Sequence, residues 1–311
     1  MKQGIAIGLD IGGTNCAFGL VDEQGRIIAR DNLPTASCAQ AEELVKALST
    51  KIKALAKEAG SPAIQGIGVG APNGNYYSGC IEFAPNLHWE GIIPIAEYFK
   101  KHLSCEASLT NDANAAAYGE MLFGAAKGMK DFLFITLGTG LGSGIVANGE
   151  MIYGHDGMAG EIGHTILFPD GRPCGCGRKG CLETYCSASG LVRTYREKAG
   201  SAFRAEMDAE YIFEKAKAGD ALALESFSFT GEWLGFALAN SVAYTSPEAI
   251  FLFGGLARAE EYIFAPTRQS FEKNLMKIYK HKIKILPSGL KPGDAAILGA
   301  ASLIWKKSMQ N

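Results

Sequence analysis

One pattern occurs twice in this chain, and it constrains the fold more than any other feature: an apolar strand, a glycine turn and two further strands. The first copy begins with the strand Gly4–Asp10 and continues, after Ile11-Gly12-Gly13-Thr14, with strands at Cys16–Val21 and Arg26–Arg30. The second copy has the same order of strands: Phe132–Leu137, Ser143–Ala147 and Glu150–Tyr153. Such self-similarity predicts a duplicated α/β unit.

The two copies of the pattern are also followed by similar segments. Helical spacing of apolar residues over 39–59 is followed by a buried strand, Ile64–Gly70, and the strand Ala249–Leu252 before Gly254-Gly255 echoes it. We expect a small N-terminal α/β domain at 1–117, with a C-terminal helix at about 295–311 packing back on it, and a larger domain at 118–294. Two facing domains with a glycine turn each would form a cleft that grips a polyphosphate.

Length and charge agree with this organisation and exclude some partners. The 311 residues fit two domains at roughly 100–200 residues each. With 30 basic and 32 acidic side chains, the net charge of −2 argues against nucleic acid or an anionic membrane as the main partner. No apolar run approaches the ~20 residues that span a bilayer, and the first strand leaves no room for a signal peptide. We therefore expect a cytoplasmic protein.

The two glycine turns point to phosphate binding. Gly12 and Gly13 allow backbone N–H groups to approach phosphate oxygens, Thr14 and Asn15 follow, and Asp10 can hold a hydrated Mg²⁺. The second turn, Gly138-Thr139-Gly140, repeats the arrangement. A single turn of this kind is more often an ordinary hairpin, but two in equivalent positions favour a nucleotide.

Two other phosphate motifs are excluded. The chain has no Gly-x-x-x-x-Gly-Lys-Ser/Thr sequence, so it is not a P-loop protein. Gly138-x-Gly140 resembles the start of a dinucleotide fingerprint, but Ser143 takes the third glycine position and a strand follows where a helix is required. A dehydrogenase is therefore disfavoured.

A cysteine cluster in the second half predicts a metal site. His164, Cys174, Cys176 and Cys181 offer one imidazole and three thiolates with glycines between the cysteines, which is typical of a structural zinc site. Cys186 is the alternative fifth candidate, and we expect it to be a buried thiol. A DNA-binding zinc ribbon is disfavoured, because the chain lacks the second Cys-x-x-Cys knuckle of such a domain.

Several polar residues have the chemistry of a sugar site. Asn111 and Asp112 stand where a helix begins; they are either a simple N-cap or, for Asp112, a carboxylate kept ionised to accept a hydroxyl proton. Glu161 precedes His164 by three residues, so a metal on His164 would also fix Glu161. Amides and carboxylates together match the donor and acceptor of each sugar hydroxyl.

Taken together, these motifs resemble the ROK family (repressors, open reading frames, kinases). The matching motifs are Asp10-Ile11-Gly12-Gly13-Thr14, Asn111-Asp112, Leu137-Gly138-Thr139-Gly140, Gly160-Glu161-Ile162-Gly163-His164 and Cys174-Gly175-Cys176-Gly177-Arg178-Lys179-Gly180-Cys181-Leu182-Glu183. The resemblance implies the duplicated actin-like ATPase and sugar kinase fold (ribonuclease H-like), with ATP, Mg²⁺ and structural Zn²⁺, and a homodimer. It is most similar to the glucokinases of that family.

The resemblance also implies a role for each matching residue. Asp112 would be the general base towards the sugar 6-hydroxyl. The other sugar ligands would be Asn86, Asn111, Glu161, His164 and Glu183, with His164 serving zinc as well. The nucleotide would lie against Asp10, Gly12, Gly13, Thr14, Asn15, Gly138, Thr139, Gly140, Gly254 and Gly255.

The chain departs from the family pattern at two positions, and three alternative functions remain open. Ser143 replaces a usual glycine in the second phosphate loop, and Asn73 stands where glycine usually follows Pro72. The expected reaction is phosphorylation of glucose, but mannose, N-acetylmannosamine, N-acetylglucosamine, fructose or allose would meet the same polar residues. A sugar-responsive regulator without kinase activity is the third alternative.

Overall fold

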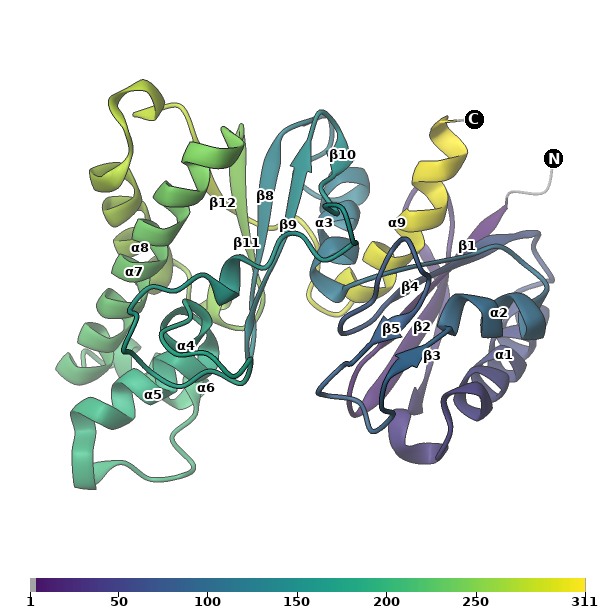
Figure 1. Ribbon diagram of the computed structural model, residues 1–311, viewed down its shortest axis with the longest axis horizontal. Coiled ribbons are helices and arrows are strands. Elements are labelled where there is room, and N and C mark those ends of the chain that lie inside the picture. Colours follow the sequence, from purple (N-terminus) through teal and green to yellow (C-terminus); the bar gives the residue numbers. More distant parts are fainter. Residues whose placement is uncertain (1–3, 311) are drawn as a thin grey trace. The chain divides into compact units, whose positions relative to one another are not determined.

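The computed structural model describes residues 4–310, with side chains as far as Lys307, and forms two compact units (Figure 1). The first unit consists of the chain up to Met129, the segment Met151–Ala159 and the chain from Gly289 onward. The second consists of Lys130–Glu150 and Gly160–Ser288. The domain limits expected from the sequence, 1–117 and 118–294, stay a prediction.

The first unit is built on a five-stranded sheet of order β3-β2-β1-β4-β7. Its strands are β1 (Ile5–Ile11), β2 (Asn15–Val21), β3 (Ile27–Pro34), β4 (Ile64–Gly70) and β7 (Ala107–Thr110). β1 is antiparallel to β2 and parallel to β4, and β4 is parallel to β7. A short hairpin, β5 (Ile81–Glu82) with β6 (Ile92–Ile93), is separate from this sheet.

Helices cover both faces of this sheet, and the two faces differ in side-chain size. The helices are α1 (Ala41–Glu58), α2 (Ile95–Leu103), α3 (Asp112–Phe123) and α9 (Ala295–Gln310), with a 3-10 turn at η1 (Thr35–Ser37). On one face, Leu9 of β1 packs in the same core as Leu44 of α1 and Phe99 of α2. On the other face α9 approaches so closely that a Cβ at Gly8 would lie 2.0 Å from the carbonyl oxygen of Ile297. Glycine on that face of β1 is thus required by packing.

The second unit repeats this sheet with the order β10-β9-β8-β11-β12. Its strands are β8 (Phe132–Leu137), β9 (Leu141–Ala147), β10 (Glu150–Met151), β11 (Ala249–Phe253) and β12 (Lys284–Pro287). β8 is antiparallel to β9 and parallel to β11, and β11 is parallel to β12. The strand order matches that of the first sheet position by position, and the directions of β9, β8, β11 and β12 match those of β2, β1, β4 and β7. This confirms the duplication predicted from the sequence.

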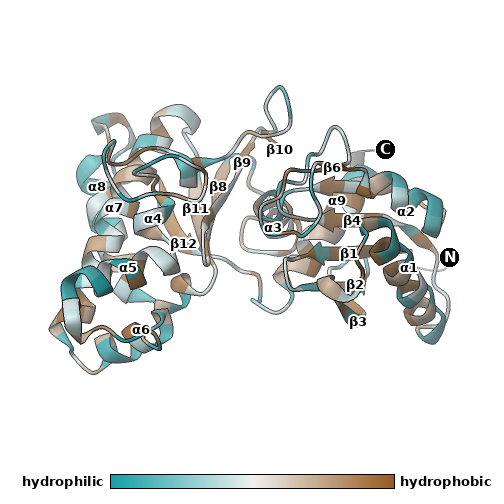
Figure 2. Cartoon of the chain, turned by 60° about the horizontal axis from the view of Figure 1, so that its bottom comes forward, coloured by the Kyte–Doolittle hydropathy of each residue, from teal (hydrophilic) through white to brown (hydrophobic). Residues whose placement is uncertain are grey.

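The second unit also contains helices and a long loop, residues 165–182, which carries Cys174, Cys176 and Cys181 and is called the cysteine loop below. The α-helices are α4 (Glu183–Cys186), α5 (Ala188–Ala199), α6 (Ala209–Lys217), α7 (Ala221–Thr245) and α8 (Glu261–Asn274). The 3-10 turns are η2 (Ile162–His164), η3 (Gly200–Ala202), η4 (Leu256–Ala259) and η5 (Lys277–Tyr279). Apolar residues of the sheet, such as Ile135 and Leu252, share one core with Phe227 of α7 and Phe264 of α8. In Figure 2 the ribbons of strands β8 and β11 are largely brown, which marks hydrophobic residues.

Some element limits differ from those predicted. The third strand begins at Ile27 and runs on to Pro34, because β2 continues to pair with it as far as Asn15. β10 ends at Met151 and leaves out Tyr153, whose ring stacks on Tyr76 at 4.2 Å between centroids. α9 reaches Gln310, and Asn311 lies outside the described residues. None of the helices within residues 4–310 is both long and apolar enough to cross a membrane.

Candidate functional site

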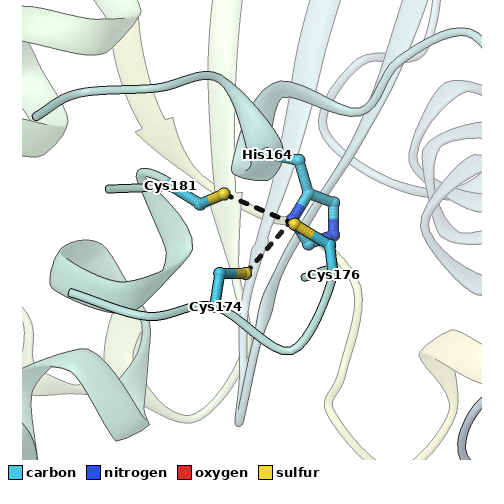
Figure 3. Close-up of side chains that lie close together, drawn as sticks. All are labelled: His164, Cys174, Cys176 and Cys181. Atoms are coloured by element: carbon cyan, nitrogen blue, oxygen red, sulfur yellow. Dashed lines mark hydrogen bonds between the residues drawn. The ribbon is translucent and has the colours of Figure 1, made fainter. Parts of the chain in front are cut away.

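Four metal-ligand side chains converge in the second unit (Figure 3). The ligand atoms of His164, Cys174, Cys176 and Cys181 all lie within 4.8 Å of one another. Cys174 Sγ is 3.6 Å from His164 Nδ1, and Cys176 Sγ is 3.6 Å from Cys181 Sγ. Metal–sulfur distances of about 2.3 Å in a tetrahedral zinc site separate the ligand atoms by roughly 3.5–3.8 Å. The donor set and its spacing therefore fit zinc.

The three thiols of this cluster differ in acidity. The backbone N–H of Arg178, aided by its guanidinium group, lowers the pKa of Cys176 to about 6. Burial raises the pKa of Cys174 to about 12 and also raises that of Cys181. A bound cation would stabilise the thiolate form of Cys174 and Cys181, so binding of a metal would release protons here.

Backbone conformation explains the glycines between the ligands. Gly177 and Gly180 have φ angles of 86° and 75°, in the left-handed region. A Cβ at Gly180 would lie 1.6 Å from the carbonyl oxygen of Phe168, and the Gly180 N–H donates to the carbonyl of Arg172 at 2.8 Å. Glycine is therefore required just before Cys181 for the loop to fold back on itself.

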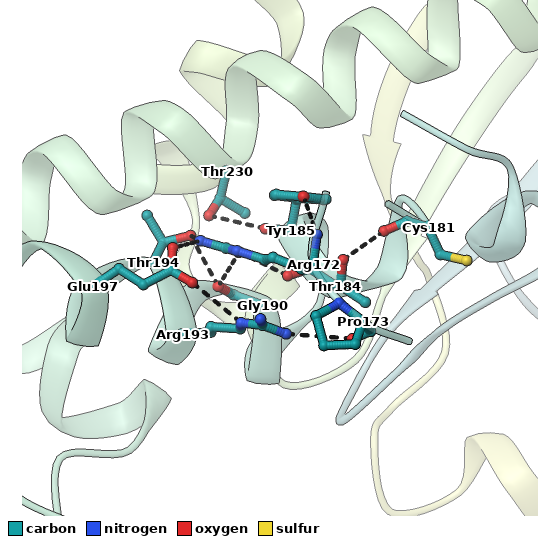
Figure 4. A network of polar contacts seen from close by, with 10 residues as sticks. All are labelled: Arg172, Pro173, Cys181, Thr184, Tyr185, Gly190, Arg193, Thr194, Glu197 and Thr230. Atoms are coloured by element: carbon teal, nitrogen blue, oxygen red, sulfur yellow. Dashed lines mark hydrogen bonds and ion pairs between the residues drawn. The ribbon is translucent and has the colours of Figure 1, made fainter. Parts of the chain in front are cut away.

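A buried arginine anchors the start of this loop to the helices behind it (Figure 4). Arg172 is 8% exposed, and its guanidinium group donates to the carbonyl of Thr184 at 2.7 Å and to Thr194 Oγ1 at 2.9 Å. It also pairs with Glu197 at 2.5 Å and lies over the ring of Tyr185, 4.4 Å from its centroid. A charge this buried is tolerated because each side of the group has a partner.

The predicted sugar ligands of the second unit lie around the metal cluster. Glu161 is exposed, and its Oε2 is 3.9 Å from His164 Nε2. Glu183 begins α4; its Oε2 accepts the backbone N–H of Leu141 at 3.1 Å, and its Oε1 is 3.6 Å from Cys174 Sγ. Glu183 therefore lies between the cluster and the second glycine turn.

Ser143, which departs from the family pattern, fastens the segment that carries Glu161. The side chain is buried, and its Oγ donates to the carbonyl of Gly160 and accepts the N–H of Ile162 at 3.2 Å. A glycine at this position could make neither bond. The hydroxyl thus ties β9 to both neighbours of Glu161.

The second glycine turn meets the other predicted nucleotide glycines at the end of β8. The Gly138 N–H donates to the carbonyl of Gly140 at 3.0 Å, and Thr139 at the tip is exposed. A Cβ at Gly254, whose φ is 107°, would lie 2.6 Å from the carbonyl oxygen of Leu137. Gly255 follows and is exposed.

In the first unit, two aspartates lie close together, one near the end of β1 and one at the start of α3. Asp10 lies near the end of β1 and Asp112 is the first residue of α3; a Cβ at Gly70 would be 3.7 Å from Asp10 Oδ1 and 3.8 Å from Asp112 Cα. Burial, with the nearby Asp112 charge, raises the pKa of Asp10 to about 7. Asp112 is solvent-accessible, yet loss of surrounding water raises its pKa as well.

The remaining predicted residues of the first unit lie at the same end of its sheet. Asn111 is the N-cap of α3, and its Oδ1 accepts the N–H of Asn114 at 2.7 Å, so the simple capping role holds for Asn111. Gly12, Thr14 and Asn15 form a turn closed by Gly12 N–H to Asn15 O at 3.0 Å.

A close backbone approach brings Asn86 to this turn. A Cβ at Gly13 would lie 2.6 Å from the carbonyl oxygen of Asn86, whose own side chain is exposed. Asn73, the second departure from the family pattern, has a φ of 50°, which asparagine tolerates better than most residues. Its Nδ2 donates to the carbonyls of Glu82 at 3.0 Å and Phe83 at 3.2 Å, so it fixes the segment that leads to Asn86.

The predicted sugar ligands thus form two groups. The first unit carries Asn86, Asn111 and Asp112, and the second carries Glu161, His164 and Glu183. Sequence reasoning did not find Arg172, because an arginine near a metal-binding cysteine is normally solvated. It noted Ser143 only because serine replaces a glycine that is usual in the family. That replacement was the signal that the side chain has a role of its own.

Comparison with known proteins identifies the family. Residues 6–307, nearly the whole chain, match the ROK family. The chain belongs to the ROK family. Thermotoga maritima glucokinase is 33% identical to it over 97% of this chain and 97% of the relative. An N-acetylmannosamine kinase of Escherichia coli is 31% identical over 96% of this chain and 97% of the relative.

Solved structures agree with this assignment. A ROK family glucokinase from Streptomyces griseus, solved in complex with glucose and AMPPNP, superposes with a TM-score of 0.81 at 34% identity. The match covers 96% of this chain and 99% of that chain. The fold is therefore that of the ROK sugar kinases, the duplicated actin-like ATPase fold expected from the sequence.

Proposed function

We propose that this ROK protein is an ATP-dependent hexose kinase that transfers a phosphoryl group to the 6-hydroxyl of glucose, with Asp112 as general base. The observation that carries the proposal is the solvent-accessible Asp112 carboxylate at the N-terminus of α3, beside Asp10. The glucokinase relatives at 33% identity support glucose as the substrate.

Asp112 would take the proton of the attacking hydroxyl. Phosphoryl transfer needs little covalent work from the protein, so a correctly positioned carboxylate and charge neutralisation account for most of the catalysis. The Oδ1 of Asp112 accepts the N–H of Ala113 at 2.9 Å, which fixes the orientation of the carboxylate and lowers its pKa by less than burial raises it. The raised pKa makes the carboxylate a stronger base than an ordinary aspartate.

The two glycine turns would bind ATP. The turn residues Gly12, Gly13, Thr14 and Asn15 and the turn residues Gly138, Thr139 and Gly140 would offer backbone N–H groups and hydroxyls to the phosphates, with Gly254 and Gly255 near the nucleoside. Asp10 would hold Mg²⁺ through its water shell, and the ion would neutralise charge on the phosphate oxygens. The AMPPNP in the S. griseus relative supports ATP as the donor.

The sugar ligands follow from the resemblance to the family. Asn86, Asn111, Glu161, His164 and Glu183 would bond the remaining hydroxyls of the sugar. We assign Zn²⁺ to His164, Cys174, Cys176 and Cys181, where it would hold the loop that carries Glu161 and Glu183. Its contribution would be structural, since four protein ligands leave no open position.

A second substrate has specific support. The N-acetylmannosamine kinases align over 96% of the chain at 31% identity, only slightly below the glucokinases. An N-acetyl sugar would use the same base and the same zinc loop, so it changes the substrate and leaves the mechanism. We further propose that the protein acts in the cytoplasm as a homodimer.

The substitution Asp112→Asn tests the assignment of the base. It keeps the size of the side chain and removes the proton acceptor, so kcat should fall by about 10²–10⁴ while the KM for glucose changes by less than about threefold. Steady-state kinetics with coupled detection of ADP gives both constants.

The matched control for this substitution is Asp294→Asn. It makes the same chemical change at a carboxylate in a surface ion pair with Arg30, and activity should stay within about twofold of the wild type. Near-normal turnover by Asp112→Asn would refute the role of Asp112 as base.

A further inference from the structure

The carboxylate of Glu183 contacts the second glycine turn directly. Its Oε2 accepts the backbone N–H of Leu141 at 3.1 Å, and Leu141 is the residue after Gly140. Sequence reasoning assigned Glu183 to the sugar and the turn to the nucleotide. A side chain assigned to the sugar therefore contacts a turn assigned to the nucleotide.

The glycine at position 140 is explained by this contact. A Cβ built on Gly140 would lie 2.3 Å from Glu183 Oε2 and 3.4 Å from Glu183 Cδ, and no atom of another residue beyond its chain neighbours comes within 4 Å. The backbone of Gly140 is not left-handed, so conformational strain does not require glycine here. What a side chain at 140 would displace is the Glu183 carboxylate.

A second contact fixes the other end of the turn to the same part of the chain. The N–H of Ala188, at the start of α5, donates to the carbonyl of Gly138 at 2.9 Å. The turn Gly138–Leu141 is therefore held at its first residue by the backbone of α5 and at its last by Glu183. Removing Glu183 would take away the acceptor of the Leu141 N–H and leave the Leu141 end held by its pairing with Leu137 in the sheet.

We infer that Glu183 is a positioning residue of the nucleotide turn: one carboxylate both serves the sugar and holds the loop that binds ATP phosphates. This inference rests on the proposed function. A preorganised loop binds its ligand more tightly because it has less freedom to lose, so Glu183 should strengthen nucleotide binding even when no sugar is present. A role confined to the sugar would have no such effect.

Binding of AMPPNP with Mg²⁺ in the absence of sugar, measured by calorimetry, tests the inference. We expect Glu183→Ala to weaken the Kd by about tenfold, since a hydrogen bond to a charged acceptor is lost. Glu183→Gln keeps an oxygen that can accept the Leu141 N–H, and its Kd should stay within about threefold of the wild type.

Glu161→Ala is the matched control. It removes another carboxylate that is proposed to bind the sugar. Like Glu183, Glu161 lies next to the proposed metal site, with its Oε2 3.9 Å from His164 Nε2. It should leave the AMPPNP affinity within about twofold of the wild type and raise the KM for glucose. Melting temperature and bound zinc are measured for each variant, so that a general loss of structure is recognised.

A double-mutant cycle gives a second, independent readout. Gly140→Ala should weaken AMPPNP binding in the wild type by pushing the Glu183 carboxylate away, and should have a clearly smaller effect in the Glu183→Ala background, where the space is free. Additive effects would show that the two positions act separately and would overturn the inference.

The outcomes separate the inference from the proposed function. If the wild type binds AMPPNP and Glu183→Ala binds it equally well, the inference is wrong and the kinase proposal stands. If the wild type binds no AMPPNP in the presence or absence of sugar, ATP as donor is refuted, and the inference is refuted with it.

Discussion

At the residue scale, the environment of Asp112 would affect both its proposed role as base and the stability of the protein. Its carboxylate is accessible to solvent, but the protein around it removes part of its hydration and raises its pKa above the ordinary 3.8. A base works only when ionised. We therefore expect kcat/KM to fall on the acid side at a pH above that of an ordinary aspartate, which a pH–rate profile of the wild type measures. An acid limb near pH 4 would contradict the raised pKa.

The same shift has a consequence for stability, and its sign follows from linkage. The folded-state pKa lies above the unfolded value, so the folded protein binds the proton more readily, and the contribution of Asp112 to stability is lost as pH rises through the folded pKa. Asp112→Asn does not titrate, so its melting temperature at pH 8 should equal or exceed that of the wild type. Active-site groups often cost stability, so this result would agree with the proposed role of Asp112.

Ser143 carries a prediction that the sequence alone did not reach. Ser143→Gly restores the residue usual in the family and removes both bonds to the segment of Glu161. We expect the KM for glucose to rise by about three- to tenfold with kcat changed less than about twofold, because binding geometry is loosened and the base is untouched. Ser189→Ala, at an exposed serine of α5, is the control. An unchanged KM would show that the bonds are only incidental.

At this scale, the sequence predicts the role of a residue where that role depends on its neighbours in the chain. Capping by Asn111 and burial of Cys186 follow from neighbours in the chain and were predictable. The partners of Ser143 and Arg172 lie 12 to 25 positions away in the chain, and no local pattern specifies them. Their roles became visible only in the folded chain.

At the scale of elements, the cysteine loop depends on its attachment to α5. Arg172 bonds to Thr194 and Glu197 of that helix and precedes Cys174, the first of the three cysteine ligands, by two residues. Arg172→Met keeps much of the volume and removes every one of these polar contacts. We expect zinc to be lost to a chromogenic chelator about tenfold faster than from the wild type, since the ligands are held less firmly.

A matched control is available on the same helix. Arg193 also pairs with Glu197, at 3.1 Å, and reaches the loop only through a 3.3 Å bond to the carbonyl of Pro173. Arg193→Met should therefore speed zinc loss much less. Equal rates of zinc loss from both variants would mean that Glu197, not the buried guanidinium, is what matters.

Element existence was easier to predict than element limits. Apolar runs such as Phe132–Leu137 and Ile64–Gly70 were predicted as strands and form them with the same limits. Glu150–Tyr153 was predicted as a strand, but Tyr153 leaves the ladder to stack on Tyr76, a residue far away in the sequence. Tertiary contacts thus decided where the strand ends.

At the scale of the whole molecule, the duplication organises the chemistry. Each sheet ends its first strand at a glycine turn. Each unit carries its own group of proposed sugar ligands: Asn86, Asn111 and Asp112 in the first unit, and Glu161, His164 and Glu183 in the second. The duplication was predictable because it is written as a repeated local pattern. The preferred sugar was not, because epimers that differ by one hydroxyl meet the same polar side chains.

The measurement that tests the central claim most directly is kcat/KM with MgATP for glucose, mannose, fructose, allose, glucosamine, N-acetylglucosamine and N-acetylmannosamine. Discrimination between substrates lies in that ratio. The account predicts turnover with a clear preference for glucose. A preference for N-acetylmannosamine would keep the base and the zinc loop and replace the substrate. Binding of sugar with no turnover of any of them would contradict the kinase assignment and favour a sugar-binding regulator.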